Sequence, residues 1–169
     1  MVDRLDTGGA EQLVLRAAAG WIRRGSVSGL VITLKKSPGS AISAELEALG
    51  VEVVECPPIS PLPMIDPLRV VKIARVLRDR KVDVVHTNLR YSNTLGPLAA
   101  RLAGLPVVAS IHNTEHRPGL RSEMKERLMR AALRAGRARI LAVGPDVAAA
   151  QQIHFPDRDL VVVSNPAPQ

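Results

Sequence analysis

Short runs of β-branched apolar residues alternate along this chain with longer segments of helical periodicity. Several runs, such as 82–85 and 107–109, are nearly continuous in apolar residues, as strands are when helices cover both faces of their sheet. The segments expected as strands are Gly29–Leu34, Val51–Glu55, Val82–Thr87, Pro106–Ile111, Arg139–Val143 and Leu160–Ser164. Those expected as helices are Glu11–Arg24, Ala41–Leu49, Leu68–Arg80, Ser92–Ala103, Ser122–Ala135 and a short one after Val143. This alternation predicts an α/β fold with a doubly wound parallel sheet in three layers and right-handed crossovers.

The length and composition suit one domain. A chain of 169 residues with 46% hydrophobic residues can bury a sizeable core, whereas two domains would be cramped. Aromatic residues make up only 2%, too few for a platform on which single-stranded nucleic acid could stack, so we expect no nucleic-acid partner. Cys56 is the single cysteine, which excludes a disulfide within the chain and fits a reducing cytoplasm. No apolar run reaches the length of a transmembrane helix, and we expect a cytoplasmic protein, at most peripheral to a membrane.

The balance of charge is strongly basic. The formal net charge is +7 and the pI is about 10.5. Such a basic balance is typical of proteins whose partners carry phosphate. Those partners include an anionic membrane surface and a phosphorylated substrate. Arginines at solvated positions account for the same numbers, and both interpretations stay open.

A paired-glycine turn, Gly8-Gly9, leads into the first expected helix. Backbone N–H groups in such a turn, together with the helix N-terminus, can form an anion site at the carboxyl end of a first strand. Only Met1–Leu5 stand in front of the segment Asp6–Glu11 that contains this turn, too few for a buried central strand. We therefore expect the neighbours of that strand to lose their backbone partners unless the sheet rearranges, the true start lies upstream, or a partner supplies the strand.

Two histidines end expected strands at the edge where ligands bind in open α/β sheets. His86 closes one strand, and His112 follows another. The proline-rich stretch 57–67 is expected to be a stiff surface loop at the same edge, either a plain connector or a ligand contact. The single Asp-x-Asp sequence, 157–159, precedes the last expected strand, at the opposite edge. We interpret it as a solvated turn and expect no metal site.

Five motifs in register cover nearly the whole chain. They are Gly8–Glu11, Asp83–His86, Gly104–Asn113, Ile140–Val143 and Val161–Pro166. In this order and spacing the set resembles the N-terminal domain of a family 4 glycosyltransferase with the GT-B fold. Gly144 and Pro166 depart from the commoner serine and glycine of relatives, and the second lies in a hinge where it does no evident harm.

The resemblance implies a Rossmann-like domain that forms the acceptor side of a two-domain transferase. It implies a retaining, metal-independent transfer without a cofactor, from a UDP- or GDP-linked sugar to a glycan or lipid-linked acceptor. Gly8 and Gly9 would bind the donor diphosphate, although an ordinary turn explains them as well. His112 would be the catalytic residue, contacting the donor sugar and stabilising charge at its anomeric carbon. Candidate acceptor or sugar contacts are Glu11, His86, Asn88, Arg90, Asn113 and Thr114.

The resemblance also leaves the donor-binding half unaccounted for. We expect residues 1–169 to be a single domain that lacks the donor domain and is inactive alone. A second polypeptide that supplies that domain would make this chain half of a split transferase. A non-enzymatic basic module for anionic surfaces is a further alternative.

A basic helical segment spans residues 121–139. It carries seven Arg and Lys residues. Its apolar members, expected to form a stripe facing the sheet, are Met124, Leu128, Met129, Ala132 and Ala135. The segment is interpreted as an amphipathic helix packed on the sheet, or alternatively as a basic surface that docks on anionic lipid.

Overall fold

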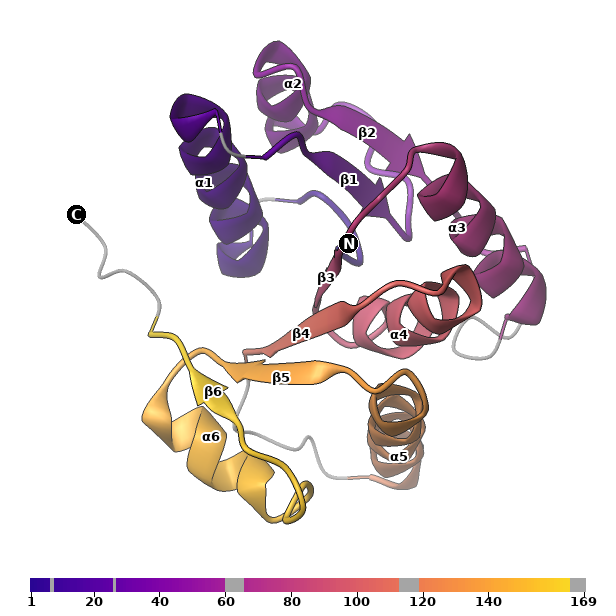
Figure 1. The fold of residues 1–169 in the computed structure, drawn as a ribbon, viewed down its shortest axis with the longest axis vertical. Helices are drawn as coiled ribbons and strands as arrows, with labels where there is room; N and C mark the ends of the chain where they lie inside the picture. Colours follow the sequence, from indigo (N-terminus) through magenta and orange to yellow (C-terminus); the bar gives the residue numbers. More distant parts are fainter. Residues whose placement is uncertain (7, 26, 60–65, 113–118, 165–169) are drawn as a thin grey trace.

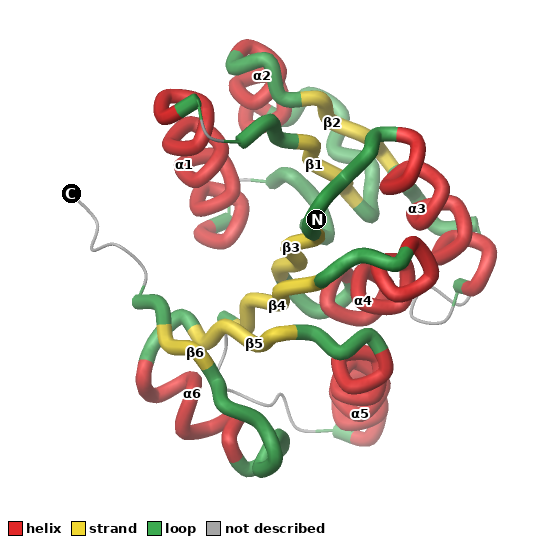
Figure 2. Tube along the Cα trace, in the orientation of Figure 1, coloured by secondary structure: helices red, strands yellow, loops and turns green. Residues whose placement is uncertain are grey.

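Six helices alternate with six strands in the computed structural model of the chain, which describes residues 1–6, 8–25, 27–59, 66–112 and 119–164 (Figure 1). The helices are α1 (Gly9–Arg24), α2 (Ala41–Ala48), α3 (Pro67–Asp79), α4 (Ser92–Ala103), α5 (Leu120–Ala135) and α6 (Pro145–Gln152). The strands are β1 (Leu30–Thr33), β2 (Glu52–Glu55), β3 (Val85–Asn88), β4 (Val107–Ile111), β5 (Arg139–Ala142) and β6 (Val161–Val162). The expected α/β class and the order of elements are confirmed (Figure 2).

All strand pairs are parallel and fall into two groups. One holds β1 and β2, and the other has the order β3-β4-β5-β6. Residues Met1 and Val2 lie between the groups. Val2 N donates to Ile32 O at 3.0 Å and Leu34 N donates to Val2 O at 3.1 Å on one side. On the other side Asn88 N donates to Met1 O at 3.0 Å and Met1 N donates to His86 O at 2.5 Å.

Met1 and Val2 thus form a seam that joins the two groups of strands. This seam corrects the expectation that the residues before Gly8 are too few for a central strand. Ladder hydrogen bonds are made residue by residue, so two extended residues suffice to bond both neighbours. Val2 is fully buried in the seam. The spatial order is therefore β2, β1, Met1–Val2, β3, β4, β5, β6, and the sheet is not rearranged.

Two apolar clusters cover the two faces of the sheet. On one face, α1 and α2 pack on Val2, Val31 and Val51 through residues such as Leu15 and Leu46. The larger cluster on the other face joins α3, α4, α5 and α6 to the strands, and its members include Ile73, Leu95, Leu133, Val147 and Phe155. The result is the three-layer arrangement typical of doubly wound sheets.

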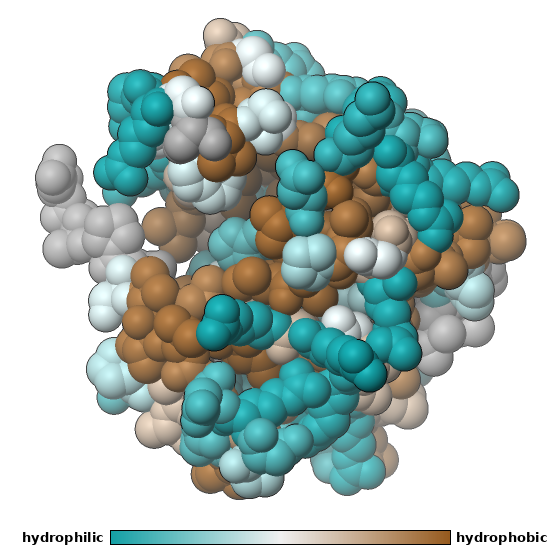
Figure 3. Space-filling model, in the orientation of Figure 1, coloured by the Kyte–Doolittle hydropathy of each residue, from teal (hydrophilic) through white to brown (hydrophobic). Residues whose placement is uncertain are grey.

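The sheet is less completely covered at its β6 end. Val161, Val162 and Val163 are 40%, 45% and 54% exposed beside β5, so neither face is fully covered there. Figure 3 shows apolar side chains gathered over β6. Parallel strands are usually buried on both faces, so this end of the sheet is the exception within the described domain.

Helix α5 corrects the expected apolar stripe. The buried residues are Glu126, Met129, Ala132 and Leu133, whereas Met124 is 61% exposed and Ala135 is also exposed. Met124 lies two residues before Glu126, about 200° around the helix, so the two face opposite directions. Glu126 takes the inner position because it pairs with Arg90. None of the described helices is both long and apolar enough to span a bilayer.

Candidate functional site

Polar side chains from β3 and β4 meet on one face of the sheet, at its carboxyl edge. The register pairs His86 with Val108 and Asn88 with Ser110, so these four residues share a face. His86 Nε2 and Ser110 Oγ share a hydrogen bond of 2.8 Å. One step further along, His112 Nε2 donates to Asn88 Oδ1 at 3.2 Å. The structure thus brings together three of the expected site residues, His86, Asn88 and His112.

Both histidines of this edge are held in the neutral form. Burial lowers the pKa of His86 to about 4, with smaller contributions from the Met1 amino group and His112. Burial also lowers the pKa of His112. Near neutral pH each imidazole is therefore an uncharged group that can donate through one nitrogen and accept through the other.

Arg90 forms an ion pair with a residue of α5. Its Nε lies 2.7 Å from Glu126 Oε1, and Glu126 is 7% exposed. This ion pair joins the loop after β3 to α5. Its function as an acceptor contact remains a prediction.

Two residues that the sequence analysis did not single out shape this edge. Ser110 holds His86, and Asp3 holds the start of α4. Asp3 accepts from Ser92 N at 2.7 Å and from Tyr91 N at 3.1 Å, and burial raises the pKa of its carboxyl. The signal for Ser110 is the alternation within Val107–Ile111, where a serine stands in an otherwise apolar strand.

The turn at Gly8 and Gly9 forms the start of α1, with Gly8 as its extended N-cap residue. A Cβ on Gly8 would lie 2.3 Å from Glu11 Oε2, so the Glu11 carboxyl lies directly against this residue. Glu11 is 7% exposed. A Cβ on Gly9 would meet no described atom within 4 Å. The Glu11 side chain therefore accounts for the glycine at position 8, whereas the space beside Gly9 remains open at a helix N-terminus.

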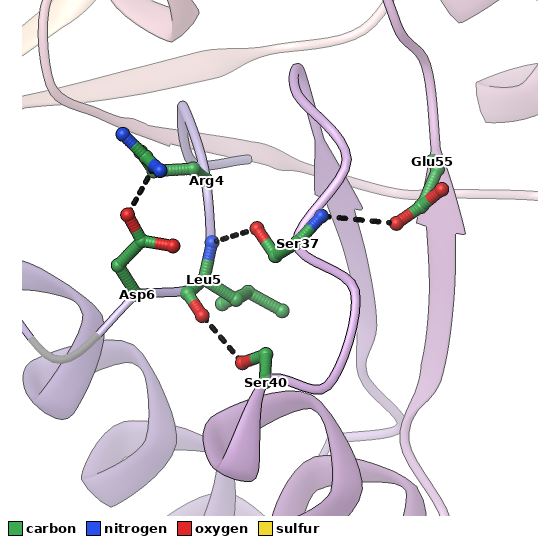
Figure 4. Close-up of polar contacts among 6 residues, drawn as sticks. All are labelled: Arg4, Leu5, Asp6, Ser37, Ser40 and Glu55. Atoms are coloured by element: carbon green, nitrogen blue, oxygen red, sulfur yellow. Dashed lines mark hydrogen bonds and ion pairs between the residues drawn. The ribbon is translucent and has the colours of Figure 1, made fainter.

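The segment before this turn is fixed to the loop between β1 and α2. Leu5 N donates to Ser37 Oγ at 3.0 Å, and Ser40 Oγ donates to Leu5 O (Figure 4). Ser37 N in turn donates to Glu55 Oε1 at 3.4 Å. Leu5 is 1% exposed, so both its backbone and its side chain hold the approach to α1 in place.

Some of the expected site residues lie where the structure is not described. Asn113 and Thr114 lie outside the described residues. Within residues 1–112 and 119–164, excluding the undescribed gaps, no three His, Cys, Asp or Glu side chains cluster as metal ligands. Nor does any hydrogen bond or ion pair among the described residues link the α1 turn to the His112–Asn88 pair.

A match to a family model identifies the family of this domain. The model of Glycosyltransferase Family 4 matches residues 7–168. The chain belongs to glycosyltransferase family 4. No curated protein matches it.

Solved structures of glycosyltransferases share this fold. HepE of Anabaena in complex with UDP superposes with a TM-score of 0.74 at 20% identity, covering 97% of this chain and 42% of HepE. A glycosyltransferase from Rickettsia africae gives 0.65 at 16% identity, covering 97% and 41%. MurG of Acinetobacter baumannii gives 0.57 at 20% identity, covering 100% and 46%. The family 4 chain thus spans less than half the length of each of these proteins, and it matches one Rossmann-like domain of their fold.

Proposed function

We propose that this family 4 domain is the acceptor-side half of a retaining, metal-independent glycosyltransferase. It would move a sugar from a UDP- or GDP-linked donor to a glycan or a lipid-linked acceptor. The observation that carries the proposal is the position of His112, immediately after β4 at the carboxyl edge and hydrogen bonded to Asn88. Ligands bind at this edge in open α/β sheets.

The electrostatics of His112 suit this chemistry. Glycosyl transfer passes through a transition state in which positive charge develops on the sugar ring. A burial-lowered pKa keeps the imidazole neutral, so it adds no repelling charge beside that centre. A neutral imidazole nitrogen can also hydrogen bond a sugar hydroxyl, and Asn88 would then orient the ring as the second partner.

The start of α1 supports a site for the donor diphosphate. Its N–H groups and the open space at Gly9 allow close approach of a phosphate without a metal ion. The structure of HepE with UDP, and another of HepE with UDP and glucose, support a nucleotide-sugar donor by analogy of fold.

Titration of the isotope-labelled chain with nucleotides tests the donor site. We expect UDP to shift the amide resonances of Gly8 and Gly9, and uridine, which lacks the diphosphate, to leave them unchanged. Equal shifts with both ligands, or none with either UDP or GDP, would contradict the assignment of the α1 turn.

Complementation tests the enzymatic half of the proposal. We expect no sugar transfer by the chain alone and transfer when a donor-domain polypeptide is co-expressed. His112→Ala should abolish that transfer, while His154→Ala, near the far end of α6, should retain it. Turnover by the chain alone would refute its dependence on a second domain, and failure of the two polypeptides to co-purify would refute the split transferase.

A non-enzymatic module for anionic surfaces is the second candidate. The net charge of +7 favours it independently of the site. A cytoplasmic location fits both candidates, because Cys56 is buried and unpaired as a thiol. Binding to anionic vesicles, together with no sugar transfer even when a donor-domain polypeptide is co-expressed, would favour this second candidate over the first.

A further inference from the structure

The end of the β3–β4 ladder leaves one carbonyl of β4 without a donor from β3. Val85 N donates to Pro106 O at 3.0 Å, and in a parallel pair every second carbonyl of a strand faces the same neighbour. Ser110 O therefore faces β3 as well, where residue 89 would supply the next N–H. Leu89 instead stands at φ +73°, in the left-handed region that does not continue a strand, and β3 ends before it. The buried Ser110 carbonyl thus needs a donor from another element.

The side chain of Asn93, in the first turn of α4, supplies that donor. Its Nδ2 donates to Ser110 O at 2.9 Å, and its Oδ1 accepts from Thr87 Oγ1 at 2.6 Å. Asn93 is 2% exposed. A Cβ on Gly96, three residues later, would lie 2.3 Å from Thr87 Cγ2, so α4 lies directly against β3 here. One buried carboxamide therefore joins the ends of both strands.

The polar side chains on either side of Asn93 bond differently. Ser92 Oγ donates to Asn88 O, and Thr94 Oγ1 donates to Arg90 O at 2.8 Å. Both bonds stay within the segment that leads from β3 into α4. Of these three described side chains, Asn93 is the one that is bonded to β4.

We propose that Asn93 is a positioning residue, which holds the end of β4 beside β3 and so sets the contact between His112 and Asn88. Asn88 directly follows Thr87, and His112 stands two residues after Ser110. The hydrogen bond of 3.2 Å between His112 Nε2 and Asn88 Oδ1 therefore lies just beyond the two groups that Asn93 joins. The catalytic meaning of this contact rests on the proposed function, whereas the positioning itself does not.

Asn93 acts from the face of the sheet opposite to the candidate site. His86, Asn88 and Ser110 share one face, so the intervening Thr87 points to the face that α4 covers. Within the described chain, no hydrogen bond of the Asn93 side chain reaches either histidine. Its effect on His112 is therefore transmitted through the strand ends.

A carboxamide suits this place because it offers a donor and an acceptor in one plane. Without the Nδ2–H group, the buried Ser110 carbonyl would lose its partner, which costs free energy until the group moves to another donor or to water. Such a movement at Ser110 would shift His112 relative to Asn88. Alanine and aspartate at position 93 both remove the donor, and aspartate also keeps the shape of the side chain.

The imidazole N–H resonance of His112 tests the proposal by NMR on the full chain. A ring proton held in a hydrogen bond exchanges slowly with water, so the Nε2–H of the wild type should give an observable signal. Asn93→Ala and Asn93→Asp should each speed its exchange by about tenfold, the factor that corresponds to the loss of one hydrogen bond of ordinary strength.

Two control variants in the same helix separate positioning from a general loss of stability. Thr94→Ala removes a buried hydroxyl that bonds to Arg90 O and not to β4. Leu95→Ala removes a core side chain that is 1% exposed, and it should lower the melting temperature at least as much as either Asn93 variant. Both controls should nevertheless keep the wild-type exchange rate of the His112 ring proton.

A measurement on the unmodified chain covers the case in which the Asn93 variants do not fold. The side-chain amide protons of Asn93 should exchange at least about tenfold more slowly than those of Gln12, which is exposed. Slow exchange supports the bond to Ser110 O, and equal rates for the two amides would overturn it.

Three further results would overturn the proposal. The first is a wild type without an observable His112 ring proton, and the second is an unchanged ring proton in folded Asn93→Ala and Asn93→Asp. The third is an equal acceleration in Leu95→Ala, which would make the effect one of stability alone. None of these experiments measures sugar transfer, so their failure and a failure of the proposed function are distinguishable.

Discussion

Helices α1 and α5 both begin at the carboxyl edge of the sheet, yet their beginnings are built in opposite ways. The approach to α1 is buried and bonded, with Leu5 held by Ser37 and Ser40 and Glu11 placed against Gly8. Neither helix has a side-chain cap, but the start of α5 exposes Leu120. A turn that the protein itself fixes can keep its geometry before a ligand arrives, whereas exposed apolar residues gain free energy only from an external partner.

The sharpest test of this contrast applies one substitution to both regions. Leu5→Ala should lower the free energy of unfolding by about 2–4 kcal/mol, because it leaves a cavity in a fully packed site. Leu120→Ala should change it by no more than about 0.5 kcal/mol. Urea unfolding of the two variants measures both values. Equal losses would show that the two helix starts are alike in the folded domain.

A second test uses pH. The pKa of His86, beside the seam that leads to α1, falls from an ordinary 6.5 to about 4 on folding. Between these values the unfolded chain binds a proton that the folded chain does not, so stability falls as the pH falls. We expect a loss of about 2 kcal/mol between roughly pH 7.5 and pH 5.

The variant His86→Gln isolates this contribution. Its unfolding free energy, followed by urea titration at each pH, should lose about 2 kcal/mol less than the wild type over the same window. A remaining pH dependence comes from the Met1 amino group, whose pKa burial lowers to about 5, and from His112, whose pKa burial also lowers. Substitution of the exposed Arg121 at α5 should leave the wild-type dependence intact, because arginine stays charged throughout. An unchanged slope in His86→Gln would contradict the buried, neutral state of this imidazole.

The hydroxyl of Ser40 supports a smaller prediction. It accepts from Ser43 N at 3.1 Å as the cap of α2 and donates to Leu5 O. Ser40→Ala should therefore cost about 1–2 kcal/mol in thermal or urea unfolding. Ser43→Ala keeps the backbone donor and serves as the control, with an expected change below about 0.5 kcal/mol. If Ser40→Ala and Ser43→Ala lower the free energy of unfolding equally, the Ser40 hydroxyl does not stabilise the segment that leads to α1.

The smallest effect concerns the contact between Gly8 and Glu11. Gly8→Ala should displace the Glu11 carboxyl, and the added cost should shrink when Glu11→Ala is already present. A double-mutant cycle should give a coupling of about 0.5–1 kcal/mol. Gly9→Ala, where a Cβ meets open space, should show no such coupling with Glu11→Ala. Additive changes at Gly8 and Glu11 would mean that the carboxyl lies elsewhere.

Most of the fold could be predicted because its signals are local. Apolar runs and helix periodicity located all twelve elements to within a few residues, as at β4, which was expected from Pro106 and begins at Val107. Strand β6 is shorter than expected, since only Val161 and Val162 pair with β5. Pairing depends on a neighbour as well as on propensity, and a single segment does not reveal it.

The errors arose where a distant partner overrides the local pattern. The central strand seemed too short because the hydrogen bonds of Met1 and Val2 come from Ile32, Leu34, His86 and Asn88. Similarly, an apolar stripe that includes Met124 ignores the pairing of Glu126 with Arg90, a residue 36 positions earlier along the numbering. Such contacts follow from topology and could not be obtained from spacing alone.

Part of the candidate site was predictable, because the order of parallel strands determines where their ends lie. Strand ends meet at one edge in any parallel sheet, which is why His86, Asn88 and His112 were expected and are found together. Asp3 and Ser110 were missed, because they hold neighbours rather than mark a motif. The function of each of these residues remains a prediction.

The two-residue seam has a consequence for motion. All the main-chain bonding between the β1–β2 pair and the four strands beyond it passes through Met1 and Val2 in the described domain. A strand so short can release its few bonds locally, so we expect these bonds to open before those inside the longer strands, although one apolar cluster joins Ile32 and Leu34 to Val85 and Leu95. The amides of Leu34 and Asn88 would then exchange together and ahead of those inside β4.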